Sequence, residues 1–213
     1  MIKAVLWDLD GVLVDTGLLH FEAWRELFAG EGKEISEEEF RRTFGLRNDA
    51  ILRDILGDLP PQKVAELSRR KEGMFRAKIA GRITPIPGVI TLLRRLRKAG
   101  KRMAVVSSAP RQNIETMLRG LEIEDAFDVI IAEEDASRGK PDPQGYLLAA
   151  QRLGVKSSEC VVVEDAPGGV EAAKLAGMLC LGLAAERAPE TLSKADLVVR
   201  SLEEEAVPRF LGV

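Results

Sequence analysis

Six short runs of apolar residues, rich in valine, isoleucine and leucine, constrain the fold of this chain more than any other feature. They cover residues 2–7, 102–107, 128–132, 160–164, 179–183 and 196–199. Continuous apolar runs of this length are typical of strands buried on both faces of a parallel sheet. Helical patterns alternate with the later runs, over residues 89–99, 144–153 and 169–176. The alternation predicts an α/β fold with a doubly wound, Rossmann-like parallel sheet and right-handed crossovers.

The stretch from residue 16 to residue 80 interrupts this alternation, because it contains helical patterns and no convincing strand. The predicted helices span residues 18–29, 37–43, 49–56 and 61–79. We therefore expect residues 16–80 to form a helical cap, inserted into a core made of residues 1–15 and 81–213. A packing appendage is the alternative. The insertion point, directly after the first strand, favours a lid that excludes water and selects a substrate.

The composition is that of a soluble globular protein, with 213 residues, 46% hydrophobic, 31% charged and a net charge of −3. This acidic balance gives no basic field for nucleic acid or a membrane surface. No apolar stretch approaches the roughly 20 residues of a membrane span, and a strand that begins at residue 2 leaves no room for a signal peptide. Cys160 and Cys180 lie in apolar runs and are expected to be buried free thiols. We expect a cytoplasmic protein.

Polar residues able to carry chemistry follow four of the predicted strands. In chain order they are Asp8 and Asp10, Ser107 and Ser108, Lys140, and Glu164 and Asp165. The carboxyl ends of parallel strands meet at one edge of a sheet, which is where open α/β sheets bind ligands. Paired carboxylates there can bind a hard cation, attack an electrophile or move a proton, and a lysine fixed between glycine and proline can hold transferring oxygens. Each loop alone is commonplace, but together they predict one site.

The motifs that contain these residues resemble those of the haloacid dehalogenase superfamily, in its phosphatase and β-phosphoglucomutase-like branch. They read DLDGVLVDT at residues 8–16, VVSS at 105–108, GKPDP at 139–143 and VEDAPGG at 163–169. The resemblance extends over essentially the whole chain, including the helical cap. It implies a phosphoric monoester hydrolase, because the second acid, Asp10, is missing from the dehalogenases of that superfamily.

The resemblance also assigns roles to the catalytic residues, which are Asp8, Asp10, Ser107 and Lys140. Asp8 is expected to be the nucleophile that forms an aspartyl-phosphate, and Asp10 the general acid and base. The implied cofactor is Mg²⁺, with ligands from Asp8, the backbone carbonyl of Asp10, Glu164 and Asp165. The residues expected to bind the phosphate oxygens are Ser107, Ser108 and Lys140.

Substrate selection is expected to depend on the cap residues His20, Arg47 and Asn48. His20 is the only histidine of the chain and lies one helical turn before Trp24. Such a histidine is more often structural, and the resemblance makes a role beside the acid and base an equal alternative. Arg47 can bind a second anionic group through its forked donors. Our alignment places Asn48, however, where the mutases carry an arginine, and this argues against a mutase that handles bisphosphates.

We therefore predict a Mg²⁺-dependent phosphatase that hydrolyses a small phosphorylated metabolite, either a sugar phosphate or a phosphoglycolate-like acid. The alternative is phosphoryl transfer between sugar hydroxyls, as in β-phosphoglucomutase, by the same chemistry at Asp8. A catalytically silent binding module is disfavoured by the complete set of acids, serine and lysine. We expect a monomer whose partner is a small-molecule phosphate ester, with no nucleic acid and no membrane bound.

Overall fold

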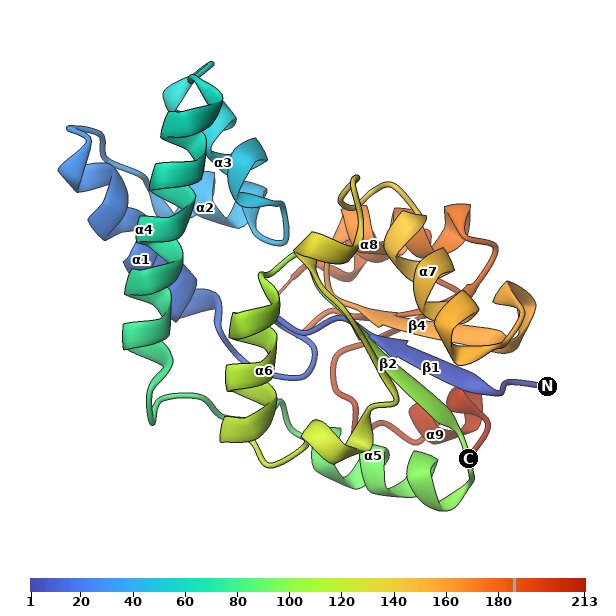
Figure 1. Cartoon of the computed structure of the whole chain (residues 1–213). Coiled ribbons are helices and arrows are strands. Elements are labelled where there is room, and N and C mark those ends of the chain that lie inside the picture. The colour runs from blue at the N-terminus through green and yellow to red at the C-terminus, as the bar shows by residue number, and fades with distance from the viewer. Residues whose placement is uncertain (186) are drawn as a thin grey trace.

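The computed structural model describes residues 1–185 and 187–213, and it contains a parallel α/β core and a helical cap (Figure 1). The sheet has the strand order β3-β2-β1-β4-β5-β6, and all neighbouring strands are parallel. The strands are β1 (Ala4–Trp7), β2 (Arg102–Val106), β3 (Val129–Ile131), β4 (Cys160–Glu164), β5 (Leu179–Leu183) and β6 (Leu197–Val199). With β1 in the middle and the order reversing there, this is a doubly wound Rossmann-like sheet, and the predicted fold class is confirmed.

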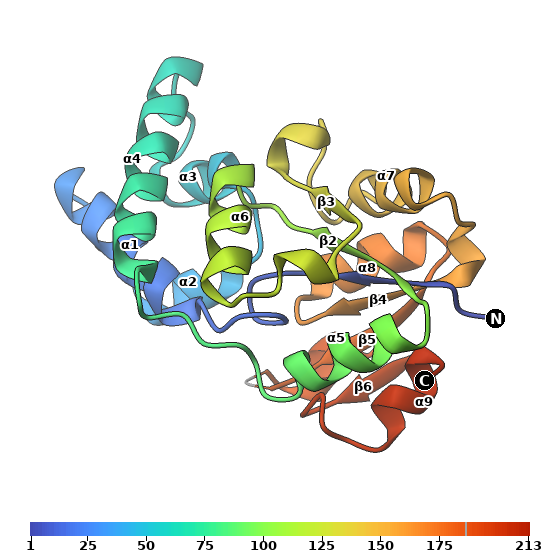
Figure 2. The same ribbon diagram turned by 60° about the horizontal axis from the view of Figure 1, so that its bottom comes forward.

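Helices cover both faces of the sheet (Figures 1 and 2). One face carries α5 (Val89–Lys98), α6 (Arg111–Gly120) and α9 (Ala206–Leu211), and the other carries α7 (Gln144–Leu153) and α8 (Pro167–Leu175). Successive residues of β1 alternate between the two apolar clusters: Val5 and Trp7 belong to the first, and Ala4 and Leu6 to the second. This double burial explains why the strands have continuous apolar sequences.

The cap consists of α1 (Gly17–Gly30), α2 (Glu37–Thr43), α3 (Asn48–Leu56) and α4 (Pro61–Ile79). A capping box starts α2, where the Glu39 N–H donates to Ser36 Oγ at 3.2 Å and the Ser36 N–H donates to Glu39 Oε2 at 2.9 Å. The cap has an apolar cluster of its own, in which the rings of Trp24 and Phe28 stack with centroids 5.1 Å apart. Figure 1 shows this helical group beyond the end of the sheet that lies away from the N-terminus.

Two connecting segments join the cap to the core, and they run side by side. Val14 and Pro85 form an antiparallel bridge, and the Ile86 N–H donates to the Leu13 carbonyl at 3.1 Å. Both crossings therefore lie next to the turn that carries Asp10, and the cap stands over the carboxyl edge of the sheet. The domain boundaries at residues 15 and 81 stay a prediction.

Candidate active site

The first acidic turn extends the central strand of the sheet. The Asp8 N–H donates to the Val163 carbonyl at 3.0 Å, which continues the β1–β4 ladder by one residue. The chain then turns at Gly11, where φ is +84°, a conformation that favours glycine. A Cβ atom at Gly11 would lie 2.5 Å from Asp165 Oδ2. Glycine at this position therefore lets the two acidic loops approach each other.

The next two strand ends bring a hydroxyl and a cation to the same edge. The Ser107 N–H donates to the Ile131 carbonyl at 3.0 Å, just beyond β2, and the Ser107 hydroxyl oxygen accepts the Ala109 N–H at 3.1 Å. Lys140 extends from the loop after β3, and its ammonium contacts both Asp8 Oδ1 and Glu164 Oε1. The hydroxyl proton of Ser107 remains available for a ligand oxygen.

Glu164, at the end of β4, has hydrogen-bond partners on both carboxylate oxygens. Besides Lys140, Oε1 accepts the Tyr146 hydroxyl at 2.7 Å. Oε2 accepts the next two backbone N–H groups at 3.0 and 3.2 Å. A Cβ atom at Gly169 would lie 1.8 Å from Oε1, so this glycine leaves the space that the carboxylate occupies. Glu164 is thus a fixed anchor for Lys140 and for the loop that carries Asp165.

Three carboxylates crowd around the end of β1 and could hold a metal ion. Oxygens of Asp8, Glu164 and Asp165 all lie within 4.8 Å of one another. Burial raises the pKa of Asp8 well above its ordinary value, and although Lys140 opposes the rise, the neighbouring acids sustain it. Burial and the Glu164 carboxylate raise the pKa of Asp165 to about 7. Lys140 and Arg187, whose Nε lies 3.8 Å from Asp165 Oδ2, leave the three carboxylates with an excess of negative charge. A hard divalent cation such as Mg²⁺ fits this all-oxygen donor set.

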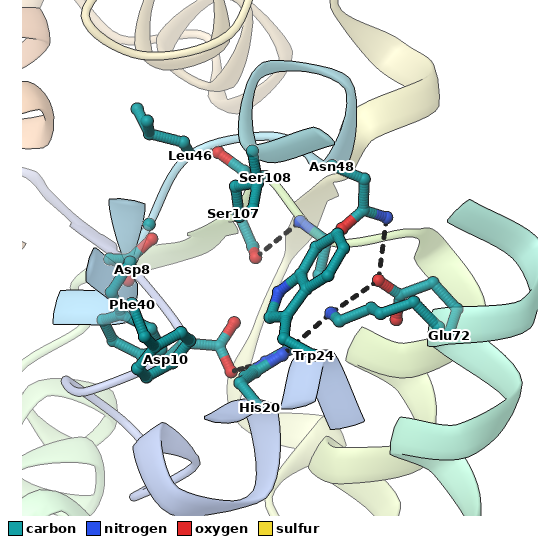
Figure 3. A pocket seen from close by; sticks show the side chains of 15 residues that line it. Asp8, Asp10, His20, Trp24, Phe40, Leu46, Asn48, Glu72, Ser107 and Ser108 are labelled. Carbon is teal, nitrogen blue, oxygen red and sulfur yellow. Dashed lines mark hydrogen bonds and ion pairs between the residues drawn. The ribbon is translucent and has the colours of Figure 1, made fainter. Parts of the chain in front are cut away.

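Asp10 points away from that cluster and is held by residues at the base of the cap. The Thr16 hydroxyl donates to Asp10 Oδ1 at 2.5 Å, and His20 Nε2 lies 3.2 Å from the same oxygen (Figure 3). Burial acts to raise the pKa of Asp10, but the hydrogen bonds from His20 and Thr16 outweigh it, and the pKa lies below its ordinary value. Asp10 is therefore ionised in this arrangement.

Beyond His20 lies a buried ion pair that the sequence analysis missed. Lys71 Nζ is 2.9 Å from His20 Nδ1 and 2.7 Å from Glu72 Oε1, and the two charged residues are only 2% and 5% exposed. Burial and the Lys71 charge lower the pKa of His20, so the imidazole is neutral. It then accepts from Lys71 at Nδ1 and donates from Nε2 to Asp10. The histidine ring also stacks on Phe75, with centroids 3.8 Å apart.

Of the three cap residues expected to bind substrate, His20 lines the cavity beside Asp10, and the neighbours Arg47 and Asn48 point in different directions. Asn48 lines the space above the strand ends, and its Nδ2 donates to Glu72 Oε1 at 2.9 Å. Arg47 instead reaches across to the core, where its Nη2 donates to the Ala136 carbonyl at 2.6 Å and to the Glu133 carbonyl at 3.2 Å. The role of Arg47 in binding substrate stays a prediction, but in this structure its Nη2 group engages the protein backbone.

A cavity of about 50 Å³ separates the cap from the strand ends (Figure 3). Its core side is formed by Asp8, Asp10, Ser107, Ser108 and Ala109. Its cap side combines apolar and aromatic side chains with His20, Asn48, Lys71 and Glu72. Ligand pockets usually measure roughly 300–1,000 Å³. The space between cap and core in this arrangement is therefore smaller than a sugar phosphate needs.

Comparison with known proteins identifies the family. Residues 2–177 match the model of the haloacid dehalogenase-like hydrolases. The chain belongs to this family. It is 34% identical over 210 residues to the validoxylamine A 7'-phosphate phosphatase of Streptomyces hygroscopicus subsp. limoneus, with 99% of each chain covered. It is 36% identical to hexitol phosphatase A of Escherichia coli, covering 97% of this chain and 94% of that protein.

Mutases are similar as well. β-Phosphoglucomutase of Bacillus subtilis is 33% identical, covering 93% of this chain and 89% of that protein. The crystal structure of β-phosphoglucomutase from Clostridium difficile superposes with a TM-score of 0.91 at 27% identity, covering 99% of this chain and 97% of that one. The expected enzyme of the haloacid dehalogenase superfamily is confirmed, and the similarity to named phosphatases supports the class of phosphoric monoester hydrolase.

Two further expectations concern the chain as a whole. Cys160 and Cys180 are buried free thiols, as the sequence indicates. Across the described ranges, every helix is too short or too polar to cross a bilayer.

Proposed function

We propose that this protein is a Mg²⁺-dependent phosphatase that hydrolyses a small phosphorylated sugar through an aspartyl-phosphate at Asp8. The observation that carries the proposal is the division of labour between the first two acids. Asp8 is paired with the Lys140 ammonium, whereas Asp10 is held by Thr16 and His20. One carboxylate thus has a cation beside it for phosphoryl transfer, and the other has partners suited to moving a proton.

Lys140 supports the role of Asp8 as the nucleophile. A carboxylate and a phosphate dianion repel each other, and a fixed positive charge between them reduces that repulsion. Burial alone would lower the pKa of Lys140, but Asp8 and Glu164 raise it above its ordinary value, so the ammonium is charged. It can hold a phosphoryl oxygen throughout the transfer, together with the hydroxyl of Ser107.

Asp8, Asp165 and the backbone carbonyl of Asp10 would hold Mg²⁺. Glu164 would support them indirectly, because its own oxygens already accept hydrogen bonds from Lys140, Tyr146 and the backbone. When bound, the ion would neutralise charge on the transferring phosphoryl group and keep Asp8 ionised. Burial and the crowding of the three carboxylates raise the pKa values of Asp8 and Asp165, and this supports a cation at this position.

Asp10 would move the proton in both halves of the reaction. Its ionised state in this structure is that of the general base that activates water. A phosphate dianion bound beside it adds negative charge, which raises the pKa of Asp10 and favours the protonated acid that the leaving oxygen needs. Thr16 and His20 orient the carboxylate for this exchange.

The charges of the cap favour a sugar phosphate over a phosphoglycolate-like acid. Among the described residues that line the cavity, Lys71 is the only lysine or arginine. Its charge is balanced by Glu72, and it lies 5.2 Å from the ring centroids of both Trp24 and Phe75. A carboxylate on the leaving group would find no unpaired cation on this wall. Neutral hydroxyls can bond to the Asn48 amide, and the apolar side chains can contact a carbon skeleton.

Water is the acceptor that we favour, in line with the phosphatases among the relatives. The mutases among them keep a sugar hydroxyl as the alternative acceptor. Asn48 supports the phosphatase, because an amide lacks the charge with which an arginine would hold the second phosphate of a bisphosphate.

Burial of both thiols in reduced form supports the proposed cytoplasmic location. A monomeric state stays a prediction.

The test measures inorganic phosphate released from a panel of sugar phosphates with Mg²⁺, alongside isomer formation from β-glucose 1-phosphate in the presence of the bisphosphate. We expect phosphate release that the Asp8→Asn variant abolishes while it keeps the wild-type circular dichroism spectrum. Isomerisation with little phosphate release would contradict the phosphatase assignment and identify the protein as a mutase. Turnover that survives Asp8→Asn would overturn the assignment of the nucleophile.

A further inference from the structure

Arg47 makes a contact between cap and core that neither its sequence position nor the proposed chemistry requires. It lies just before α3 in the cap, yet its guanidinium donates to two carbonyls of the core, those of Glu133 and Ala136. Both belong to the segment that follows β3 and leads directly to Lys140. One cap side chain thus holds the beginning of the loop that carries the active-site cation.

The same side chain also lies against the end of that loop. A Cβ atom at Gly139 would be 2.7 Å from Arg47 Nε, 2.9 Å from its Cδ and 3.1 Å from its Cγ. The stem of Arg47 therefore packs directly on the backbone of the residue that precedes Lys140. Arg47 Nε is buried there without a hydrogen-bond partner, so close packing rather than further polar contacts accounts for this part of the interface.

We propose that Arg47 is a positioning residue that fixes the Lys140 loop when the cap is closed. With the cap in place, Arg47 holds residues 133–139 from one side, while Asp8 and Glu164 hold the Lys140 ammonium from the other. When the cap moves to admit a substrate, the loop loses the first of these supports. Closure of the cap and placement of the Lys140 ammonium are thereby coupled.

The directions of these groups favour this role over direct substrate binding. The Nη2 group of Arg47 is engaged with carbonyl oxygens, and Arg47 is absent from the side chains that line the cavity. Asn48, the next residue, does line it. Adjacent residues of the cap loop therefore divide between the substrate side and the core side.

The test is a double-mutant cycle between Arg47→Ala and Gly139→Ala, with Arg53→Ala, an exposed arginine of α3, as the matched control. The φ of Gly139 lies outside the left-handed region, so alanine strains no backbone there and acts by displacing Arg47. The first readout is amide hydrogen exchange of residues 133–140, which requires no turnover. The second is kcat with 4-nitrophenyl phosphate and Mg²⁺, which rests on the proposed function.

We expect each single variant to speed exchange in residues 133–140 and to lower kcat by about 10- to 100-fold, since small misplacements of a catalytic group have effects of this size. In the Arg47→Ala background, Gly139→Ala should add nothing. Unchanged exchange in Arg47→Ala, or additive effects of the two substitutions, would overturn the proposal. So would a rise in KM with kcat intact, because that marks a residue that binds substrate. A wild-type protein that hydrolyses no phosphate ester would refute the proposed function alone, and the exchange measurement would still decide the role of Arg47.

Discussion

Replacement of Glu72 by glutamine tests whether the cap and core are joined around a buried ion pair. Glu72 accepts hydrogen bonds from Lys71 at 2.7 Å, from Asn48 at 2.9 Å and from Asn113 of the core helix α6. Lys71 is 2% exposed, so water cannot replace the lost carboxylate. Breaking a buried pair by removing one partner destabilises a protein by about 3–5 kcal/mol.

For a chain of this length, 1 kcal/mol shifts the melting temperature by roughly 2–4 °C, so Glu72→Gln should lower it by roughly 6–20 °C. Glu22→Gln is the matched control in the same subdomain. Glu22 pairs with Arg82 at 3.1 Å, but the two side chains are 25% and 47% exposed, and solvent-exposed pairs contribute little. Its melting temperature should stay near that of the wild type.

The loss of stability in the Glu72→Gln variant should also depend on pH. Burial lowers the pKa of Lys71, and Glu72 opposes that effect, so its removal lowers the pKa further. A base whose pKa is lower in the folded state than in the unfolded state reduces the free energy of unfolding. The full reduction applies below the folded-state pKa, and it fades as the pH rises towards the unfolded-state pKa of about 10.4. The difference in melting temperature between variant and wild type should therefore shrink from pH 7 to pH 10. A variant that melts like Glu22→Gln at pH 7 would refute the reasoning.

Three further predictions follow from the site. Gly169→Ala should lose about 1–3 kcal/mol of stability and most of the activity, because the new Cβ would lie 1.8 Å from Glu164 Oε1. Gly168→Ala is the control: a Cβ there has nothing within 4 Å, so this variant should resemble the wild type in thermal melts and phosphate release. Removal of divalent cations with EDTA should abolish phosphate release, and Mg²⁺ should restore it; activity that persists in EDTA would exclude the proposed cofactor. 2-Hydroxyethyl phosphate should exceed 2-phosphoglycolate in kcat/KM by at least about tenfold, and equal values would contradict the charge argument for the leaving group.

The strands could be predicted from the sequence because each is an apolar run with one explanation, burial on both faces. The boundaries of all six predicted runs agree with the described strands within two residues. Two helices of the core were missed for local reasons. Helix α6 (Arg111–Gly120) has Asn113 fully buried among its apolar positions, which blurs the helical pattern. Helix α9 (Ala206–Leu211) is short and contains Pro208.

The core site could be predicted in outline because the parallel sheet itself brings the strand ends to one edge. The cap side could not. Lys71 belongs to the stripe that Leu67, Phe75 and Ile79 form along α4, and this position is a signal of burial that the sequence analysis overlooked. Its partner His20 comes from another helix, and such a partner emerges only from tertiary packing. The direction of the long Arg47 side chain is equally invisible in the sequence.

Detection of the phosphorylated enzyme is the most direct test of phosphoryl transfer through Asp8. The protein would be mixed with a ³²P-labelled sugar phosphate and Mg²⁺, quenched in acid within the first turnover, and digested for peptide mapping by mass spectrometry. Label on the peptide that contains Asp8, absent in Asp8→Asn, is the predicted result. Steady phosphate release with no label on the protein, or label on a different residue, would contradict it.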